Sequence, residues 1–214
     1  MTPCRIVIIA KAPLPGYCKT RLIPALGPEG AAALATGMLR RTVQTALDAC
    51  IGPVEVCAAP TAAHPLWTSL QLPAALHWSD QGQGDLGQRM EHAARRTLAR
   101  KEHVVLIGTD CPSLTTTHLS DAAMALQRGE AALIPTFDGG YALLGLAAMQ
   151  TSVFNDMPWS TSVVARLTLE RLEKAGRGVH IGPMLHDIDE PEDLPHLPLQ
   201  LSCFEPNTPQ EPHA

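Results

Sequence analysis

Three cations lie close together in one short loop near the N-terminus. Lys11, Lys19 and Arg21 belong to the stretch KAPLPGYCKTRL, which directly follows the apolar run RIVIIA of residues 5–10. The β-branched residues of that run predict a buried strand. Two prolines stiffen the loop, and Gly16 lets the backbone approach a ligand closely. A basic loop of this shape after a first strand is suited to a polyanion, most simply the phosphates of a nucleotide.

The same loop also has a purely structural interpretation, as a rigid surface turn whose cations are solvated. Its proline and glycine content and its place after a strand favour phosphate binding. It is not a Walker A loop, which requires GxxxxGK[ST], because Gly16 precedes Lys19 by three residues. An ordinary P-loop ATPase is therefore not expected.

Two aspartates are candidate ligands for a divalent cation. Asp110 lies in GTDCPSL, directly after the apolar run of residues 103–108, and Asp189 lies in HDIDEPEDL. Mg²⁺ in proteins usually takes one or two carboxylates and leaves its other positions to water and phosphate oxygens. Asp187 and Asp189 point to the same side if that segment is extended. Alternatively, Asp110 caps the next helix or turn, and Asp189 belongs to a solvated acidic loop.

Three further motifs have both a functional and a structural interpretation. In FDGGY (residues 137–141) the adjacent glycines permit a close approach of a ligand, but Asp-Gly is also a strong hairpin signal. In PWSTS (158–162) the hydroxyls precede a helix, as an N-cap or as an anion site. The motif QGDLGQRM (83–90) could hold a nucleoside or simply begin a helix. No Ser/His or Cys/His nucleophile–base set stands out.

The composition excludes several classes of function. The chain of 214 residues favours one domain, which we expect over residues 1–200, followed by a polar, Pro-rich tail over residues 201–214. The formal net charge of −5 and the aromatic content of 4% argue against a nucleic-acid or anionic-membrane partner. The cations of the opening loop are therefore a local feature.

Cysteine spacing and the chain start indicate a reduced, cytoplasmic protein. The six cysteines form no CxxC pair and no zinc-like cluster with histidine. Met1-Thr2-Pro3 leads directly into the first strand without a signal peptide, and no apolar stretch is expected to reach transmembrane length. Nothing in the sequence indicates an oligomeric state.

Strand and helix patterns alternate along the chain. This alternation predicts a three-layer α/β/α sandwich on a mostly parallel sheet, whose ligands bind at the carboxyl ends of the strands. Helices are expected from Gly27 to Gly52, over 65–70, after Gly87, and over 117–127 and 163–175; strands are expected over 5–10, 54–59, 76–79, 103–108, 131–135, 141–146 and 179–181.

Six motifs together, KAPLPGYCKTRL, QGQGDLGQRM, GTDCPSL, DGGYALLGL, PWSTS and DIDEPEDL, occur in this order. With them the chain resembles the bacterial glycosyltransferase A-type proteins described as nucleotide-diphospho-sugar transferase-like. It is more distantly similar to molybdenum-cofactor guanylyltransferase and phospholactate guanylyltransferase. The resemblance covers about residues 4–197. It implies a Rossmann-like mixed sheet that binds a nucleoside triphosphate or a nucleotide sugar with Mg²⁺ or Mn²⁺.

The resemblance also implies roles for particular residues. Asp110 and Asp189 match the metal ligands of the family, and Lys19, Arg21 and Asp110 are the expected catalytic residues. Tyr141 is followed by Ala142, where the family often has a second tyrosine. The expected nucleotide-binding residues are Lys11, Gly16, Lys19, Thr20, Arg21, Gly84, Asp85 and Gly87, and the expected acceptor-binding residues are Asp138, Gly139, Gly140, Ser160 and Thr161.

The favoured function is a Mg²⁺-dependent nucleotidyltransferase that acts on a small phosphorylated acceptor. The acceptor would attack the α-phosphate of a nucleoside triphosphate and release pyrophosphate. A single aspartate in Gly-Thr-Asp, rather than two spaced by one residue, favours this branch. The alternatives are a glycosyltransferase that uses a nucleotide-sugar donor, and a module that binds a nucleotide without turning it over.

Overall fold

The computed structural model describes residues 2–201 of the chain. Most of the expected tail therefore lies outside the described residues. Within them, seven strands form one sheet in the order β3-β2-β1-β4-β6-β5-β7. The strands are β1 (Cys4–Lys11), β2 (Val54–Ala59), β3 (His77–Asp80), β4 (His103–Ile107), β5 (Ala131–Pro135), β6 (Tyr141–Leu146) and β7 (Val179–Ile181).

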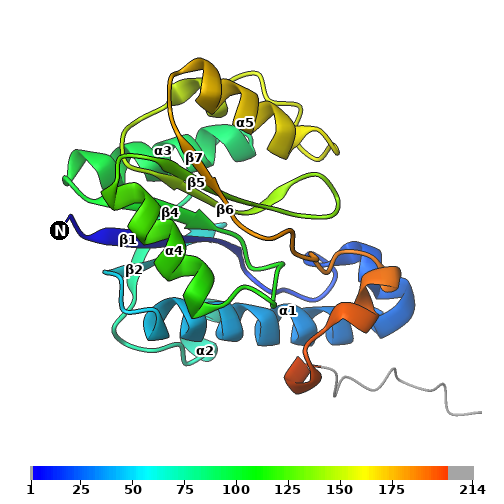
Figure 1. Cartoon of the computed structure of the whole chain (residues 1–214). Coiled ribbons are helices and arrows are strands. Elements are labelled where there is room, and N and C mark those ends of the chain that lie inside the picture. The colour runs from blue at the N-terminus through cyan, green and yellow to red at the C-terminus, as the bar shows by residue number, and fades with distance from the viewer. Residues whose placement is uncertain (1, 202–214) are drawn as a thin grey trace, which may run out of the picture.

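The strands share one direction except for β6. Strands β1 to β4 pair in parallel, β6 is antiparallel to both β4 and β5, and β5 pairs in parallel with β7. The carboxyl ends of the other six strands therefore meet at one edge of the sheet, on the right in Figure 1. The predicted fold, a mostly parallel mixed sheet, is confirmed.

Helices cover both faces of the sheet (Figure 1). Along β1 the side chains alternate, because neighbouring residues of a strand point to opposite faces. Ile6 and Ile8 pack in the cluster that holds α1 and α4, whereas Val7 packs in the cluster that holds α3 and α5. The helices are α1 (Ile23–Asp48), α2 (Pro65–Ser69), α3 (Leu86–Ala99), α4 (Thr116–Gln127) and α5 (Val164–Lys174), with 3-10 helices η1 (Thr20–Leu22), η2 (Thr151–Val153), η3 (Pro191–His196) and η4 (Leu199–Leu201).

Helix α1 differs from its prediction in where it begins. It starts at Ile23, before the expected Gly27, but Gly27 has φ 71° and ψ 167° and divides it into two segments across a kink. Pro28 follows in the first turn of the longer segment, where proline is favoured. The signal at Gly27 thus marks the start of the longer segment and not of the whole helix.

The expectation that no stretch reaches transmembrane length is wrong for this helix. Together with η1 it is long and apolar enough to cross a membrane, by length and composition alone. One side of α1 nevertheless packs in the core, and a single helix that passes this test is weak evidence of a membrane span. Its buried residues are Ala31, Ala32, Leu34, Met38, Leu39, Thr42, Val43 and Ala46.

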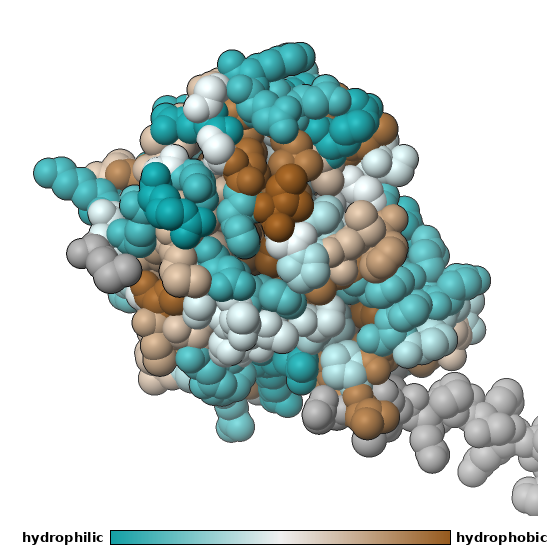
Figure 2. Space-filling model, in the orientation of Figure 1, coloured by the Kyte–Doolittle hydropathy of each residue, from teal (hydrophilic) through white to brown (hydrophobic). Residues whose placement is uncertain are grey.

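Apolar side chains reach the surface at the edge strand β7. Ile181, at its end, is 54% exposed, and Met184 in the following segment is 51% exposed. Figure 2 shows this apolar surface over β7, bordered by hydrophilic side chains. The segment after β7 then runs along the carboxyl edge of the sheet, where Leu185 pairs with Thr136 and where the site lies.

Candidate functional site

The loop after β1 directs one of its cations inward. Lys19 has a left-handed backbone, with φ 46° and ψ 43°, directly before η1. Upstream, the amides of Tyr17 and Cys18 both donate to the carbonyl of Leu14, which closes a tight turn. The side chain of Lys19 is only 8% exposed. A cation of the predicted phosphate loop is therefore buried within the protein.

Lys19 lies between the two predicted metal ligands. Its Nζ forms an ion pair with Asp110 Oδ1, and lies 2.6 Å from Asp189 Oδ1. It also donates to the carbonyl oxygen of Ile188 at 2.7 Å. The carboxylates of Asp110 and Asp189 are 47% and 42% exposed, so each still faces solvent. The structure thus brings Asp110 and Asp189 together around one cationic atom.

Apolar packing explains how three distant segments meet there. Leu22 and Ile188 are both fully buried in a cluster at the carboxyl edge of the sheet. Lys19 precedes Leu22 by three residues, and Asp189 directly follows Ile188. The amide of Ile188 also donates to the carbonyl of Asp110 at 2.9 Å. Burial of Leu22 and Ile188, with the hydrogen bond from Ile188 to Asp110, therefore holds the ammonium of Lys19 close to both carboxylates.

The ammonium of Lys19 stays charged in this setting. Burial by itself lowers the pKa of Lys19, but the charges of Asp110 and Asp189 outweigh it and raise the pKa above its usual value. The neighbouring thiols behave differently, because burial raises the pKa of Cys18 and of Cys111. Neither thiol is poised as a thiolate nucleophile.

The two carboxylates fit a divalent cation. The Oδ1 atoms of Asp110 and Asp189 both contact the position that is occupied here by the ammonium nitrogen of Lys19. Within residues 2–201 no group of three His, Cys, Asp or Glu side chains is placed to hold a metal ion, so protein ligands would be few. Two carboxylates are what Mg²⁺ usually takes, with water and phosphate oxygens in its other positions. Metal and ammonium cannot occupy this point together.

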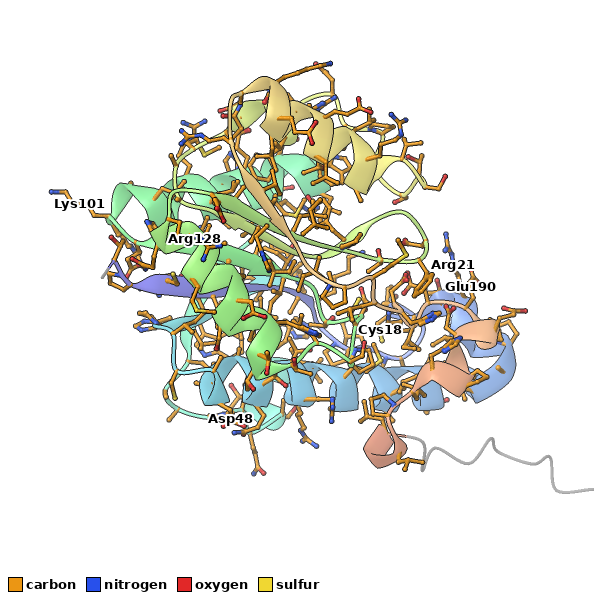
Figure 3. The ribbon with its side chains drawn as sticks, viewed as in Figure 1. Cys18, Arg21, Asp48, Lys101, Arg128 and Glu190 are labelled. Carbon is orange, nitrogen blue, oxygen red and sulfur yellow. The ribbon has the colours of Figure 1, made fainter. Side chains whose placement is uncertain are left out.

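The other cations of the loop lie nearer the surface. Arg21 Nη1 pairs with Glu190 Oε1 at 3.0 Å, and its side chain is 66% exposed. Lys11, at the end of β1, is exposed, as is Thr20. Figure 3 shows Cys18, Arg21 and Glu190 grouped at the carboxyl edge, whereas Lys101 lies at the opposite end of the molecule.

The segment predicted to lie near the nucleoside begins α3. Asp85 is the N-cap of this helix, and it forms a capping box with Gln88. The structural interpretation of Asp85 is therefore realised in the fold. Gly84 has φ +104°, and a side chain at Gly87 would collide with the carbonyl of Phe154 and the indole of Trp159. These glycines are required by backbone conformation and by packing.

Sequence reasoning missed Gln81, which positions that segment. Its buried amide donates from Nε2 to the carbonyls of Ala10 at 2.9 Å and Cys57 at 3.0 Å. Its backbone amide donates to Ala58. Gln81 therefore fastens the loop before α3 to the carboxyl ends of β1 and β2. A glutamine directly after a strand and before a glycine-rich loop was the available signal.

The predicted acceptor-binding residues lie on the far side of β4. Strands β5 and β6 form the hairpin that Asp-Gly indicated, and Asp138 Oδ1 accepts from Thr136 Oγ1 at 2.5 Å and from the amide of Gly140 at 2.8 Å. A side chain at Gly139 would collide with the carbonyl of Ser162, so this turn packs tightly on the segment before α5. The hairpin interpretation of FDGGY is thereby realised.

The hydroxyls of PWSTS do not cap α5, contrary to one sequence interpretation. The N-cap is Val163, and no side chain donates or accepts there. Thr161 Oγ1 instead donates to the carbonyl of Pro158 at 2.6 Å, and Ser160 has a left-handed φ of 62°. Both residues remain exposed next to the hairpin turn. No contact places them beside Lys19.

In the sequence Asp187 stands out only as a neighbour of Asp189. Burial raises its pKa to about 6, and the negative charges of Asp138 and Asp189 add to the effect. On the other side of this segment His186 stacks between Phe137 and His196, with ring centroids 4.0 Å and 3.7 Å apart. These rings hold the segment after β7 against the hairpin turn, which sequence periodicity alone could not reveal.

A cavity of about 380 Å³ lies at the end of the sheet opposite the carboxyl ends of the parallel strands. Its lining includes Leu98, His103 and Met149, near the amino end of β4. None of the predicted site residues borders it. The charged side chains at the carboxyl edge therefore remain the candidate site.

Comparisons with known proteins agree with this architecture. A family profile described as "Uncharacterized protein conserved in bacteria (DUF2064)" matches residues 42–161. No curated protein matches the chain. A crystal structure from Desulfovibrio desulfuricans G20, provisionally described as a nucleotide-diphospho-sugar transferase, is 30% identical. It superposes with a TM-score of 0.81 and covers 89% of this chain and 84% of its own.

Two more distant structures share the fold. CMP:2-keto-3-deoxy-manno-octonic acid synthetase, complexed with CTP, is 10% identical, with a TM-score of 0.54 and coverage of 91% of this chain and 96% of that one. Rv0371c from Mycobacterium tuberculosis H37Rv, complexed with manganese, is 16% identical, with a TM-score of 0.54 and coverage of 92% and 98%. At these identities the likeness concerns the fold alone.

Proposed function

This chain belongs to the bacterial family described as DUF2064, and we propose that it is a nucleotidyltransferase dependent on Mg²⁺ or Mn²⁺. The enzyme transfers a nucleotidyl group from a nucleoside triphosphate to a small acceptor and releases pyrophosphate. One observation carries this proposal. Asp110 Oδ1 and Asp189 Oδ1 converge on a single cationic atom at the carboxyl edge of the sheet.

That edge is where nucleotides bind in open α/β sheets. Asp110 and Asp189 would hold the divalent cation, which neutralises charge on the triphosphate as pyrophosphate leaves. With Asp110 and Asp189 holding a cation, the ammonium of Lys19 would be free of these carboxylates and would lie beside the phosphates. Lys11 and Arg21, on the same loop, add positive charge there.

The nucleoside has a natural place beside the phosphates. The loop of residues 81–87 follows β3, and Gln81 fastens it to the ends of β1 and β2, where the phosphate loop begins. Residues 82–86 of this loop are exposed, and the positive φ of Gly84 is a conformation that glycine adopts readily. The two loops thus lie on the same side of β4 and can hold one nucleotide between them.

Two likenesses support a nucleotide ligand. The Desulfovibrio desulfuricans protein is described as handling a nucleotide-diphospho-sugar, and the synthetase of the same fold is complexed with CTP. The manganese in Rv0371c supports a divalent cation on this fold.

The test is nucleotide binding by calorimetry, with and without Mg²⁺, for the wild-type protein, Asp110→Asn and Asp189→Asn. Asp48→Asn is the matched control, because Asp48 ends α1 far from the site (Figure 3). We expect Mg²⁺ to strengthen triphosphate binding in the wild type and the control only. An equal effect of Mg²⁺ in all four proteins would contradict the proposal.

The alternative is glycosyl transfer from a nucleotide sugar, favoured by the description of the Desulfovibrio desulfuricans protein. The same cation would then stabilise a departing nucleoside diphosphate. A donor screen separates the two functions. A nucleotidyltransferase releases pyrophosphate from a triphosphate, whereas a glycosyltransferase releases a nucleoside diphosphate from a nucleotide sugar.

A further inference from the structure

The order of strands divides the site into two sides. The phosphate loop and the loop of residues 81–87 follow β1 and β3, on one side of β4. The hairpin turn of residues 136–140 and the segment of residues 182–188 lie on the other side. In-line transfer requires the acceptor to enter opposite the leaving pyrophosphate. If the proposed function holds, the acceptor therefore enters from the hairpin side.

The hairpin side presents a carboxylate in a fixed orientation. Asp138 Oδ1 accepts hydrogen bonds from Thr136 Oγ1 and from the amide of Gly140. Both of these bonds end on the same oxygen, which leaves Oδ2 to meet a substrate. The turn itself is held by the bridge between Thr136 and Leu185 and by the stack of Phe137 on His186. The position of Asp138 is thus set by several contacts.

The three segments that form the hairpin side supply no lysine or arginine to a phosphate. Residues 136–141, 158–163 and 182–190 contain neither lysine nor arginine. Lys19 and Arg21, the cations of the neighbouring loop, pair with aspartate and glutamate in this structure, and in the proposed function they serve the triphosphate. At the start of α5, the amide of Ala165 is taken by the carbonyl of Gly139 at 2.8 Å.

Negative charge faces an acceptor instead. Asp138 and Asp187 each lie two residues after the bridged pair Thr136 and Leu185, so both carboxylates belong to this side. A phosphorylated acceptor would bring two further negative charges toward these carboxylates. An ionised phosphate is moreover a nucleophile that needs no proton acceptor, whereas a hydroxyl group must lose its proton during the attack.

We propose that Asp138 is the proton acceptor for a hydroxyl-bearing substrate that carries no phosphate. In the step, the acceptor oxygen forms a bond to the α-phosphorus while its proton moves to Asp138 Oδ2. The bond from the α-phosphorus to the bridging oxygen breaks, and its electron pair leaves with pyrophosphate. Asp138 then releases the proton to solvent. This acceptor class replaces the phosphorylated acceptor that the sequence had indicated.

Three probes test the proposal without knowledge of the natural acceptor. The full-length protein is incubated with Mg²⁺ and a nucleoside triphosphate in water, with glycerol, or with ³²P-labelled inorganic phosphate. Attack by water yields a nucleoside monophosphate, attack by glycerol a phosphodiester, and attack by phosphate a labelled nucleoside diphosphate. Pyrophosphate release and mass spectrometry of the products are measured.

We expect pyrophosphate release that rises with glycerol, a phosphodiester product and no labelled diphosphate. Asp138→Asn should lower this turnover by at least about 100-fold, with triphosphate affinity by calorimetry unchanged. Thr136→Val retains the carboxylate but removes one of its two hydrogen bonds, and should lower turnover about tenfold. Asp48→Asn, at the far end of α1, should match the wild type.

The contrary outcomes are distinct. Labelled diphosphate formed in preference to the glycerol product would overturn the acceptor class. Unchanged turnover in both Asp138→Asn and Thr136→Val would overturn the role of Asp138. That role would also be overturned if the wild-type protein binds the triphosphate but releases no pyrophosphate with any probe. If the wild-type protein binds no nucleotide at all, the proposed function itself fails, and the inference fails with it.

Discussion

Lys19 Nζ lies 2.6 Å from Asp189 Oδ1, although 170 residues separate the two along the chain. The same nitrogen pairs with Asp110, so an ammonium group lies where two carboxylates converge. The sequence had assigned Lys19 to phosphate and the two aspartates to a metal. The structure joins these groups in one ion cluster, in which the ammonium is buried and both carboxylates still face solvent. A divalent cation must therefore compete with Lys19 for its ligands.

Replacement of Lys19 should strengthen metal binding. Lys19→Met keeps the long apolar stem of the side chain but removes the ammonium that competes for Asp110 and Asp189. A like charge a few ångströms away costs on the order of 1 kcal/mol even in water. We expect Mn²⁺ to bind about tenfold more tightly to the variant, as measured by electron paramagnetic resonance without nucleotide. Unchanged or weaker Mn²⁺ affinity would argue against competition.

Glu55 should be important for stability although it lies outside the site. It is 2% exposed and accepts hydrogen bonds from Ser79, on β3, and from Arg96, on α3; Arg5 lies 3.4 Å from its other oxygen. Burial alone would raise the pKa of Glu55, but the bonds from Ser79 and Arg96 outweigh it and lower the pKa. Removal of one partner of a buried ion pair leaves charges uncompensated.

Glu55→Gln should therefore lower the free energy of unfolding by about 3 kcal/mol, measured by urea denaturation at neutral pH. The matched control is Glu130→Gln, which breaks the exposed pair with Arg128 and should leave stability unchanged. Equal stability of the two variants would mean that the network around Glu55 does not hold α3 to the sheet.

Stability should fall in mild acid through His103, at the start of β4. Burial lowers the pKa of this imidazole in the folded protein. Its ordinary value is about 6.5, so the unfolded chain binds the proton at a higher pH than the folded protein does. The contribution of His103 is therefore complete above about pH 6.5 and is lost as the pH falls through the folded pKa.

The measurement for His103 is urea unfolding at about pH 7.5 and 5.5, together with an NMR titration of the imidazole. His103→Asn should lose less stability than the wild type between these two values. An NMR pKa at or above that of an unstructured histidine would refute the assignment.

Gly139→Ala should be far more harmful than the corresponding change at Gly16. Both glycines have left-handed backbones, with φ +88° and +78°. A side chain at Gly139 would collide with the carbonyl of Ser162, whereas one at Gly16 meets nothing within 4 Å. We expect Gly16→Ala to lower the free energy of unfolding by about 1 kcal/mol, which is the conformational penalty alone. Gly139→Ala should lower it by more than twice as much.

Thermal unfolding of the two alanine variants measures this difference. Gly139→Ala should also disturb Asp138, the adjacent residue in the turn. Similar melting temperatures would show that the turn can move away from the segment before α5.

Much of the fold could be predicted because its signals are local. The apolar run of residues 103–108 indicated a strand buried on both faces, and β4 lies in the middle of the sheet. Asp-Gly at residues 138–139 indicated a hairpin, and β5 and β6 form it. The boundary error at the start of α1 arose because Gly27, taken as the helix start, is a kink within the helix.

The sequence by itself determined which chemical groups reach the carboxyl edge of the sheet. Strand periodicity places Lys19, Asp110 and Asp138 in loops after strands, and this depends only on neighbouring residues. Which of these groups touch was decided by the tertiary structure alone. The burial of Leu22 against Ile188 brings Lys19 to Asp189, and the stack of Phe137 on His186 holds the turn of Asp138. Such contacts join residues far apart in the chain, so they depend on strand order and side-chain packing, which no local pattern encodes.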